Sequence, residues 1–255
     1  DCYPKFETSK LPSLTPPTTS PIDVFSTTEY LSRIGCLSYL VKRTHPEYAA
    51  VCGYLARRQS NFTAIDCYHL QRVFQHLYQR RHSRFTIIGS SDFSLTAFVD
   101  ADWAGCSNDR RSVSGSVVFV GKTPVLWSSR KQDTVAMSTM EAEYYAVTEC
   151  LKDVMFVRNL LGELFGAESI VPIPKIFCDN QAAIAISLSQ GNKRNVRHID
   201  LRYQAMKQAF EQKKAELEFI SSSMNRADGL TKILPSNKFG QSASFLNLTT
   251  ESMNI

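Results

Sequence analysis

Acidic residues directly follow two segments of the chain that have the pattern of buried β-strands. In the stretch "LTAFVDADWAG", Asp100 and Asp102 come at the end of an apolar run. A second short segment with a strand pattern, from Lys175 to Cys178, ends at Asp179. Burial of a carboxylate costs free energy unless a metal ion or a paired charge offsets it. The fold must therefore supply a compensating group beside the ends of these two strands.

Residues 26–84 have the apolar periodicity of three helices, which separates them from the segments on either side. Residues 1–25 are rich in Pro, Ser and Thr, so we expect a disordered linker there. Ser26 and Glu29 have the spacing of a capping box, which predicts the start of the first helix. The sequence therefore predicts a small helical unit at 26–84, directly after the linker.

Residues 85–137 change to β-branched and aromatic residues with turn breaks, which is typical of strands. The spacing of Ser138 and Glu141 then predicts a capped long helix, after which helix and strand alternate. This order predicts an α/β domain at 85–235, with a mixed sheet, flanking helices, and ligands at the carboxyl ends of strands. Residues 236–255 show no clear period, so we expect a tail. The expected strands are 85–89, 95–100, 115–121, 124–130, 133–137, 175–178 and 215–221.

Two further carboxylates are expected to face the same site. Glu143 is in phase with the apolar stripe of the long helix, which continues through Val147 and Val154, so it should point at the sheet. Asp228 opens the last predicted helix. Taken singly, each acid has an ordinary explanation as a turn residue, a helix cap or a partner of an arginine such as Arg158. Taken together, the acids would repel one another without a cation, whereas two Mg²⁺ ions about 4 Å apart would neutralise them and support phosphoryl transfer.

The order Asp, Glu, Asp, Asp on strand, helix, strand and helix resembles the ribonuclease H family, above all its domain in copia-type LTR retrotransposon polyproteins. The motifs that carry this resemblance span residues 98–232 in order: "VDADWAG", "RRSVSG", "LWSSRKQDTVAMSTMEAEYYA", "FCDNQAAI", "RHIDLRY" and "RADGLTK". The resemblance implies a ribonuclease H-like mixed five-stranded sheet and an endoribonuclease that cuts the RNA strand of RNA–DNA hybrids. It also implies that two Mg²⁺ ions, or Mn²⁺ ions, are bound by four carboxylates: Asp100, Glu143, Asp179 and Asp228.

The segment before the predicted sheet extends the resemblance. "RIGCLSYLVKRTHPEYAAV" and "LQRVFQHLY" are similar to the thumb or connection segment that joins the reverse transcriptase to ribonuclease H in these polyproteins. The chain contains no Tyr-x-Asp-Asp, the motif of the polymerase centre. The resemblance therefore implies an upstream reverse transcriptase region as a partner. It also implies a location in a cytoplasmic virus-like particle, with the nucleus as the alternative.

The loop before Asp228 departs from the family pattern. Cellular and retroviral ribonucleases H usually carry a mobile histidine there, whereas this chain has "SSSMNRAD". Proton transfer and product release by such a histidine are therefore not expected from this loop. Asp102 shares the strand parity of Asp100. We expect a solvated turn acid at Asp102, with a supporting role at the metal site as the alternative.

Positive charge gathers after residue 190 and is expected to hold a nucleic-acid backbone. The formal net charge of +5 and the pI of about 8.8 are compatible with such a partner. Ser112 and Ser114 offer hydroxyl groups for contacts to sugar and phosphate. An ordinary solvated helix face is the alternative to a phosphate grip. The expected phosphate-binding residues are Lys193, Arg194, Arg197 and Arg202.

Other classes of protein are disfavoured by what the sequence lacks. The 7 cysteines include no C-x-x-C pair, so neither a zinc site nor a disulfide framework is indicated. No apolar run reaches the length that spans a bilayer, and the first residues have no secretory pattern, so we expect no membrane partner.

Three functions compete on this sequence. The first is an active, metal-dependent ribonuclease H, which the four intact acids favour. The second is a non-catalytic, domesticated scaffold or nucleic-acid-binding module that has kept the fold. The third is another nuclease class: transposases and integrases of this fold use the order Asp, Asp, Glu, and proofreading exonucleases begin with Asp-x-Glu. The observed order and the Asp-x-Asp at Asp100 favour the first function.

Overall fold

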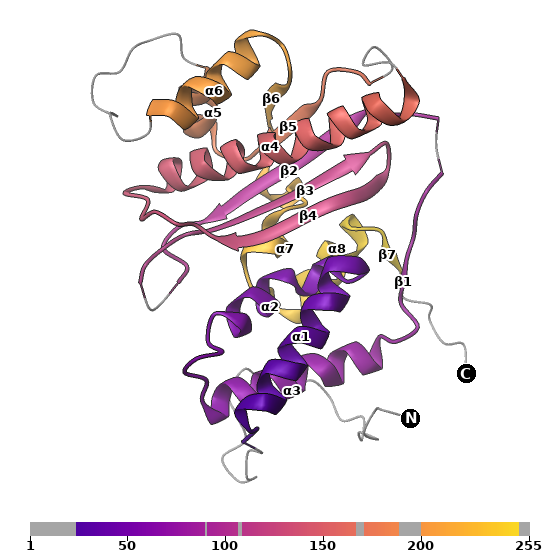
Figure 1. Ribbon diagram of the computed structural model, residues 1–255, viewed down its shortest axis with the longest axis vertical. Coiled ribbons are helices and arrows are strands. Elements are labelled where there is room, and N and C mark those ends of the chain that lie inside the picture. Colours follow the sequence, from indigo (N-terminus) through magenta and orange to yellow (C-terminus); the bar gives the residue numbers. More distant parts are fainter. Residues whose placement is uncertain (1–23, 90, 107–108, 167–170, 189–199, 250–255) are drawn as a thin grey trace.

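A computed structural model describes residues 24–89, 91–106, 109–166, 171–188 and 200–249 (Figure 1). The predicted disordered linker therefore lies outside the described residues, apart from its last two positions. Within the described part of the chain, no helix is both long enough and apolar enough to cross a bilayer.

Five strands form a mixed sheet in the order β4-β3-β2-β5-β6. The strands β2, β3 and β4 are antiparallel neighbours, whereas β2, β5 and β6 run parallel to one another. This arrangement confirms the predicted α/β fold with a mixed five-stranded sheet. The bounds of the strands are Leu95–Asp102 (β2), Val113–Val120 (β3), Thr123–Lys131 (β4), Lys175–Cys178 (β5) and Glu216–Phe219 (β6).

One face of the sheet is covered by α4, α5 and α6 (Figure 1). The long helix α4 (Thr139–Phe165) begins at its N-cap Ser138, whose side chain accepts a hydrogen bond from the Glu141 backbone, and ends at Gly166 in the left-handed conformation. Its apolar stripe meets Leu95, Ala97 and Val99 of β2 in one buried cluster, as the period of two along a strand requires. The other two helices are α5 (Gln181–Leu188) and α6 (Asp200–Glu211).

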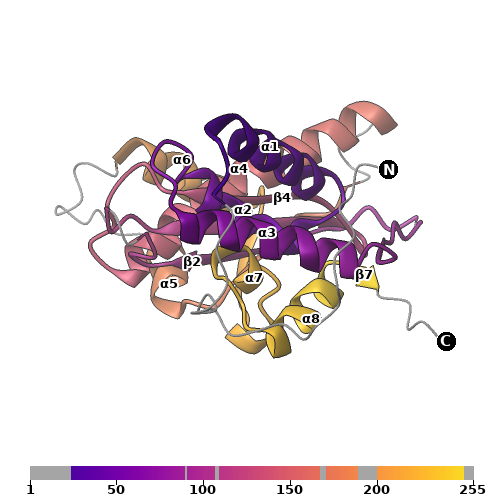
Figure 2. The same cartoon turned by 90° about the horizontal axis from the view of Figure 1, so that it is seen from below.

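The opposite face is covered by the predicted helical unit together with the end of the chain (Figure 2). The capping box of Ser26 and Glu29 is present, and the indole Nε1 of Trp127 in β4 donates to the Val41 carbonyl at 2.8 Å. On this face of the sheet, a second buried core includes Phe98, Val117 and Phe119. The helices are α1 (Thr27–Arg43), α2 (Ala49–Ala56), α3 (Ala64–Gln79), α7 (Asp228–Thr231) and α8 (Ser236–Phe245).

Residues from the predicted tail form regular structure that returns to the start of the sheet region. Besides α8, the strand β7 (Leu248–Thr249) pairs antiparallel with β1 (Arg84–Phe85). Leu246 and Leu248 are buried in the same core as α1, α2 and α3. The sequence pattern did not reveal these elements, because α8 has few apolar residues and β7 is only two residues long.

Two strand predictions are corrected. Residues 133–137 form bends and irregular backbone, because they lead into the N-cap Ser138 and the Met137 N–H donates to Glu141 Oε2 at 2.7 Å. The Glu141 carboxylate is thereby engaged with Met137, so the full capping box predicted at Ser138 does not form. The strand predicted at 85–89 is limited to Arg84–Phe85, since its partner β7 is equally short.

Candidate metal centre

The carboxyl ends of β2 and β5 bring Asp100 and Asp179 to the same edge of the sheet. The two strands are parallel, and the last paired residues are Val99 and Cys178. The two aspartates come next after this pair, so they lie at the same level of the sheet, although β2 continues to Asp102. Asp100 is almost completely buried, at 2% exposure, whereas Asp179 is half-buried. This edge is where the sequence predicted a ligand site.

Glu143 reaches the same edge from α4. Its side chain is buried, as its phase in the apolar stripe predicted. Burial, together with the charges of Asp100 and Asp179, raises the pKa of Glu143 to about 8. Oxygen atoms of Glu143 and Asp179 and the sulfur of Cys178 all lie within 4.8 Å of one another. A cation placed among these atoms would remove the repulsion between the two carboxylates.

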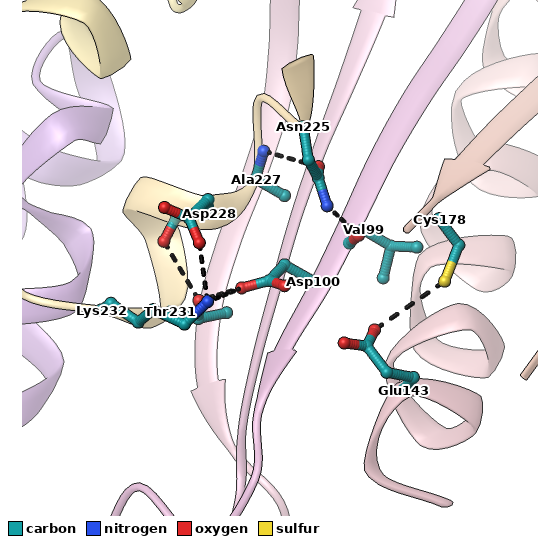
Figure 3. Close-up of polar contacts among 9 residues, drawn as sticks. All are labelled: Val99, Asp100, Glu143, Cys178, Asn225, Ala227, Asp228, Thr231 and Lys232. Carbon is teal, nitrogen blue, oxygen red and sulfur yellow. Dashed lines mark hydrogen bonds and ion pairs between the residues drawn. The ribbon is translucent and has the colours of Figure 1, made fainter. Parts of the chain in front are cut away.

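Asp228 lies on the other side of Asp100, at the start of α7 (Figure 3). The Lys232 ammonium joins the two acids: its Nζ is 2.6 Å from Oδ1 of Asp228 and 3.4 Å from Oδ2 of Asp100. The Thr231 hydroxyl donates a hydrogen bond to the same Oδ2 of Asp100. Asp100 is therefore the acid that connects the Asp228 side of the site with the side of Glu143 and Asp179.

Short-range contacts hold α7 in this position. The Asn225 side chain donates from Nδ2 to the Val99 carbonyl at 2.9 Å, and its Oδ1 accepts from the Ala227 backbone at 3.1 Å. At Gly115 of β3, a Cβ atom would lie 2.7 Å from Cγ2 of Thr231, so the absence of a side chain lets α7 approach the sheet closely. These contacts fix the distance between the helix that carries Asp228 and the strand that carries Asp100.

The four predicted ligands influence one another electrostatically. Burial raises the pKa of Asp100; Lys232 and Thr231 oppose this shift, and the charges of Asp179 and Asp228 add to it. Asp102 is half-buried rather than fully solvated, and burial raises its pKa too. Clustered carboxylate oxygens are the ligands that Mg²⁺ and Mn²⁺ prefer. The donor set therefore fits a hard divalent cation, with Cys178 as a sulfur neighbour.

The structure describes only some of the predicted substrate-binding residues. Lys193, Arg194 and Arg197 lie outside the described residues. The backbone of Arg202 is described as part of α6, but its side chain is not. Ser112 is fully buried, and its Oγ accepts from the Ala104 backbone at 3.2 Å. In this structure the Ser112 hydroxyl is therefore engaged within the turn, and its contact to substrate stays a prediction.

Ser114 lies at a polar pocket between the sheet and α4. Its Oγ accepts from Nε2 of the buried Gln132 at 2.8 Å. The pocket has a volume of about 160 Å³, and its charged lining includes Arg130, Lys131 and Asp153. The positive charges of Arg130 and Lys131 at this pocket are thus partly matched by acids.

The sequence motifs did not predict the contacts that Thr231, Lys232 and Asn225 make in the site. The first two belong to the motif "RADGLTK", which was recognised only for Asp228, and Asn225 directly precedes it. The signal was therefore present as a motif, but the motif alone does not show which of its side chains turn toward Asp100. The described histidines, His45, His69, His76 and His82, all belong to the helical unit.

No family model matches this chain. It is 31% identical over 210 residues to the retrovirus-related Pol polyprotein from transposon TNT 1-94 of Nicotiana tabacum, which covers 82% of this chain and 16% of that protein. It is 30% identical over 222 residues to the corresponding polyprotein from transposon RE1 of Arabidopsis thaliana, which covers 87% of this chain and 15% of that protein.

Among solved structures, LC11-RNase H1, isolated from compost by a metagenomic approach, matches 60% of this chain and 99% of that chain, with 16% identity and a TM-score of 0.42. The chain spans about one sixth of the length of the curated polyproteins named above. Their similarity confirms the resemblance to retrotransposon polyproteins that the motifs predicted. The chain therefore belongs to the family of retrovirus-related Pol polyproteins from transposons.

Proposed function

We propose that this chain is the ribonuclease H segment of a copia-type polyprotein, and that it cuts the RNA strand of RNA–DNA hybrids with the help of two divalent ions. The observation that carries the proposal is the meeting of Asp100, Asp179 and Glu143 at the carboxyl ends of β2 and β5, with Asp228 beside them. Buried acids that raise one another's pKa are typical of catalytic sites.

The chain's own residues would hold the ions and orient the acids. Asp100, Glu143 and Asp179 would hold one Mg²⁺ or Mn²⁺ ion, and Asp100 with Asp228 the other. Bound ions of this kind activate a water molecule and stabilise charge on the phosphate in an in-line displacement. Thr231 holds one oxygen of Asp100, and Asn225 ties the loop before α7 to β2, so that both ligand groups keep their geometry.

The proposal includes the binding of the hybrid by its phosphates. Lys193, Arg194, Arg197 and Arg202 would supply positive charge after α5, and Ser114 with Arg130 would add contacts at the polar pocket. An upstream reverse transcriptase region of the same polyprotein would deliver the hybrid. The corresponding location is a cytoplasmic virus-like particle, with the nucleus as the alternative.

The decisive test is cleavage of a hybrid with labelled RNA by Asp100→Asn and Asp179→Asn variants in Mg²⁺. We expect the cleavage rate to fall by about a hundredfold or more. A loss of this order is usual when a charge-stabilising group is removed from an active site. Asp109→Asn is the matched control, because Asp109 is partly exposed and pairs with Lys131. Full activity in the Asp100→Asn variant would rule out the assignment. Hybrid binding without cleavage by the unaltered chain would instead support the non-catalytic binding module.

A further inference from the structure

Lys232 places a positive charge inside the acidic site, on the side where Asp100 and Asp228 meet (Figure 3). It follows Asp228 by four residues, so the two side chains lie on the same side of one helical turn. The Lys232 ammonium therefore lies between two carboxylates, within ion-pair distance of both.

The other side of the site is formed by Glu143 and Asp179, whose oxygen atoms lie within 4.8 Å of each other and of the Cys178 sulfur. Among the described residues, neither of these two carboxylates forms an ion pair with a lysine or an arginine. The two sides of the site therefore differ within the described structure: Lys232 partly neutralises the side of Asp100 and Asp228, and no described cation pairs with the side of Glu143 and Asp179.

A divalent ion and an ammonium group compete for the same carboxylate oxygens. Both are attracted to Asp100 Oδ2 and Asp228 Oδ1, and their own repulsion is strong where water is partly excluded. The Lys232 side chain is 43% exposed. Its long flexible stem can carry the ammonium toward solvent without moving the backbone of α7.

We propose that Lys232 is a built-in counter-ion, which occupies the side of the site formed by Asp100 and Asp228 until a divalent cation displaces it. The inference rests on the proposed metal-dependent function and adds an order of loading. The side formed by Glu143 and Asp179 binds Mg²⁺ at lower concentration, and the side held by Lys232 binds it only when the ion outcompetes the ammonium.

The first test compares the melting temperature of the whole chain across Mg²⁺ concentrations in wild type, Lys232→Met and Lys238→Met. Methionine keeps the length of the lysine stem and removes the charge. Lys238 is an exposed lysine of α8 and controls for the change in net charge. We expect Lys232→Met to melt below wild type in EDTA. We also expect its Mg²⁺ midpoint to be about tenfold lower than that of wild type and of Lys238→Met.

A second measurement uses only the wild-type chain, so it does not depend on the folding of a variant. Brief treatment with acetic anhydride labels exposed, unpaired amines, and mass spectrometry of peptides reports the extent of labelling at each lysine. Displacement by Mg²⁺ predicts that labelling of Lys232 increases severalfold between EDTA and saturating Mg²⁺. Labelling of Lys238 should stay constant.

The outcomes separate the inference from the function on which it rests. If wild type and Lys232→Met show the same Mg²⁺ midpoint, or if labelling of Lys232 does not respond to Mg²⁺, the lysine does not compete with the ion and the inference is wrong, although metal binding stands. If Mg²⁺ changes the melting temperature of neither protein, the metal-dependent function and the inference both fail. A Lys232→Met variant that folds only with Mg²⁺ would support the inference.

Discussion

At the scale of single residues, burial shifts the pKa of several titratable side chains. His76 in α3 is an example away from the candidate metal centre: its Nδ1 lies 2.8 Å from the Tyr48 hydroxyl, and its ring lies 5.1 Å from that of Phe239. Burial lowers the pKa of His76 from 6.5 to about 4, and the nearby Arg80 and Arg72 act in the same direction. The folded chain therefore keeps this ring neutral in conditions where an unfolded chain would protonate it.

This shift predicts a loss of stability on acidification. Between pH 6.5 and about 4 the unfolded chain binds a proton at His76 that the folded chain refuses, so the free energy of unfolding decreases as the pH falls through that window. The contribution is at most about 1.4 kcal/mol per pH unit and levels off below pH 4. The measurement is denaturant unfolding at several pH values.

The matched variants are His76→Gln, which can still form a hydrogen bond with the Tyr48 hydroxyl but does not titrate, and His82→Gln, which removes an exposed histidine. His76→Gln should flatten the pH dependence and His82→Gln should leave it as in wild type. An identical slope in both variants would contradict the assignment of the effect to His76.

At the scale of elements, the contact between α7 and β3 decides where Asp228 and Lys232 stand. Gly115 makes that contact possible, because a Cβ atom there would lie 2.7 Å from Thr231 Cγ2 and 2.9 Å from Leu230 Cβ. Both distances are shorter than side-chain carbon atoms tolerate. A larger residue at this position must therefore push α7 away from the sheet.

We expect Gly115→Ala to destabilise the chain by about 1–3 kcal/mol, the usual cost of overpacking. Because α7 carries Asp228, cleavage should decrease more than the loss of folded protein explains. Gly35→Ala is the control: no atom lies within 4 Å of a Cβ built there, and alanine in the exposed face of α1 should be neutral or stabilising. Denaturant melts together with cleavage rates at full folding check both effects, and equal effects of the two substitutions would contradict the explanation.

The elements that the sequence predicted are those whose signals are local. The period of α4 placed Glu143 on the buried side, and the strand pattern placed Asp100 and Asp179 at strand ends, because each pattern repeats over several residues. The pairing of β1 with β7 is a long-range contact between two-residue strands, so no local period announces it. The contact between Lys232 and Asp100 likewise depends on how α7 crosses β3, which the residues of α7 alone do not encode.

At the scale of the whole molecule, one core joins the helical unit, one face of the sheet and the end of the chain. Tyr30 and Leu55, Phe98 and Phe119, and Leu246 all belong to this cluster. The buried helical unit and the sheet are therefore expected to unfold together, since neither keeps its apolar face covered without the other.

This shared core predicts the effect of Leu246→Ala. Leu246 is fully buried, so truncation should cost about 2–5 kcal/mol and lower a single cooperative transition. Tryptophan fluorescence, to which Trp103 contributes together with Trp127 at the contact with α1, should follow the same curve as far-ultraviolet circular dichroism. Leu164→Ala, at a site 67% exposed, should have little effect. Two separate transitions would show that the helical unit and the sheet are independent domains.

The same core also sets an order in time during synthesis. Within this segment, α1 to α3 leave the ribosome before the residues against which they pack, which are Phe98 and Phe119 of the sheet and then Leu230 and Leu246. The last of these partners is made about 200 residues after α1. The apolar faces of these helices therefore stay exposed until their partners have been synthesised. Folding of this segment is completed only after residue 248 has left the ribosome.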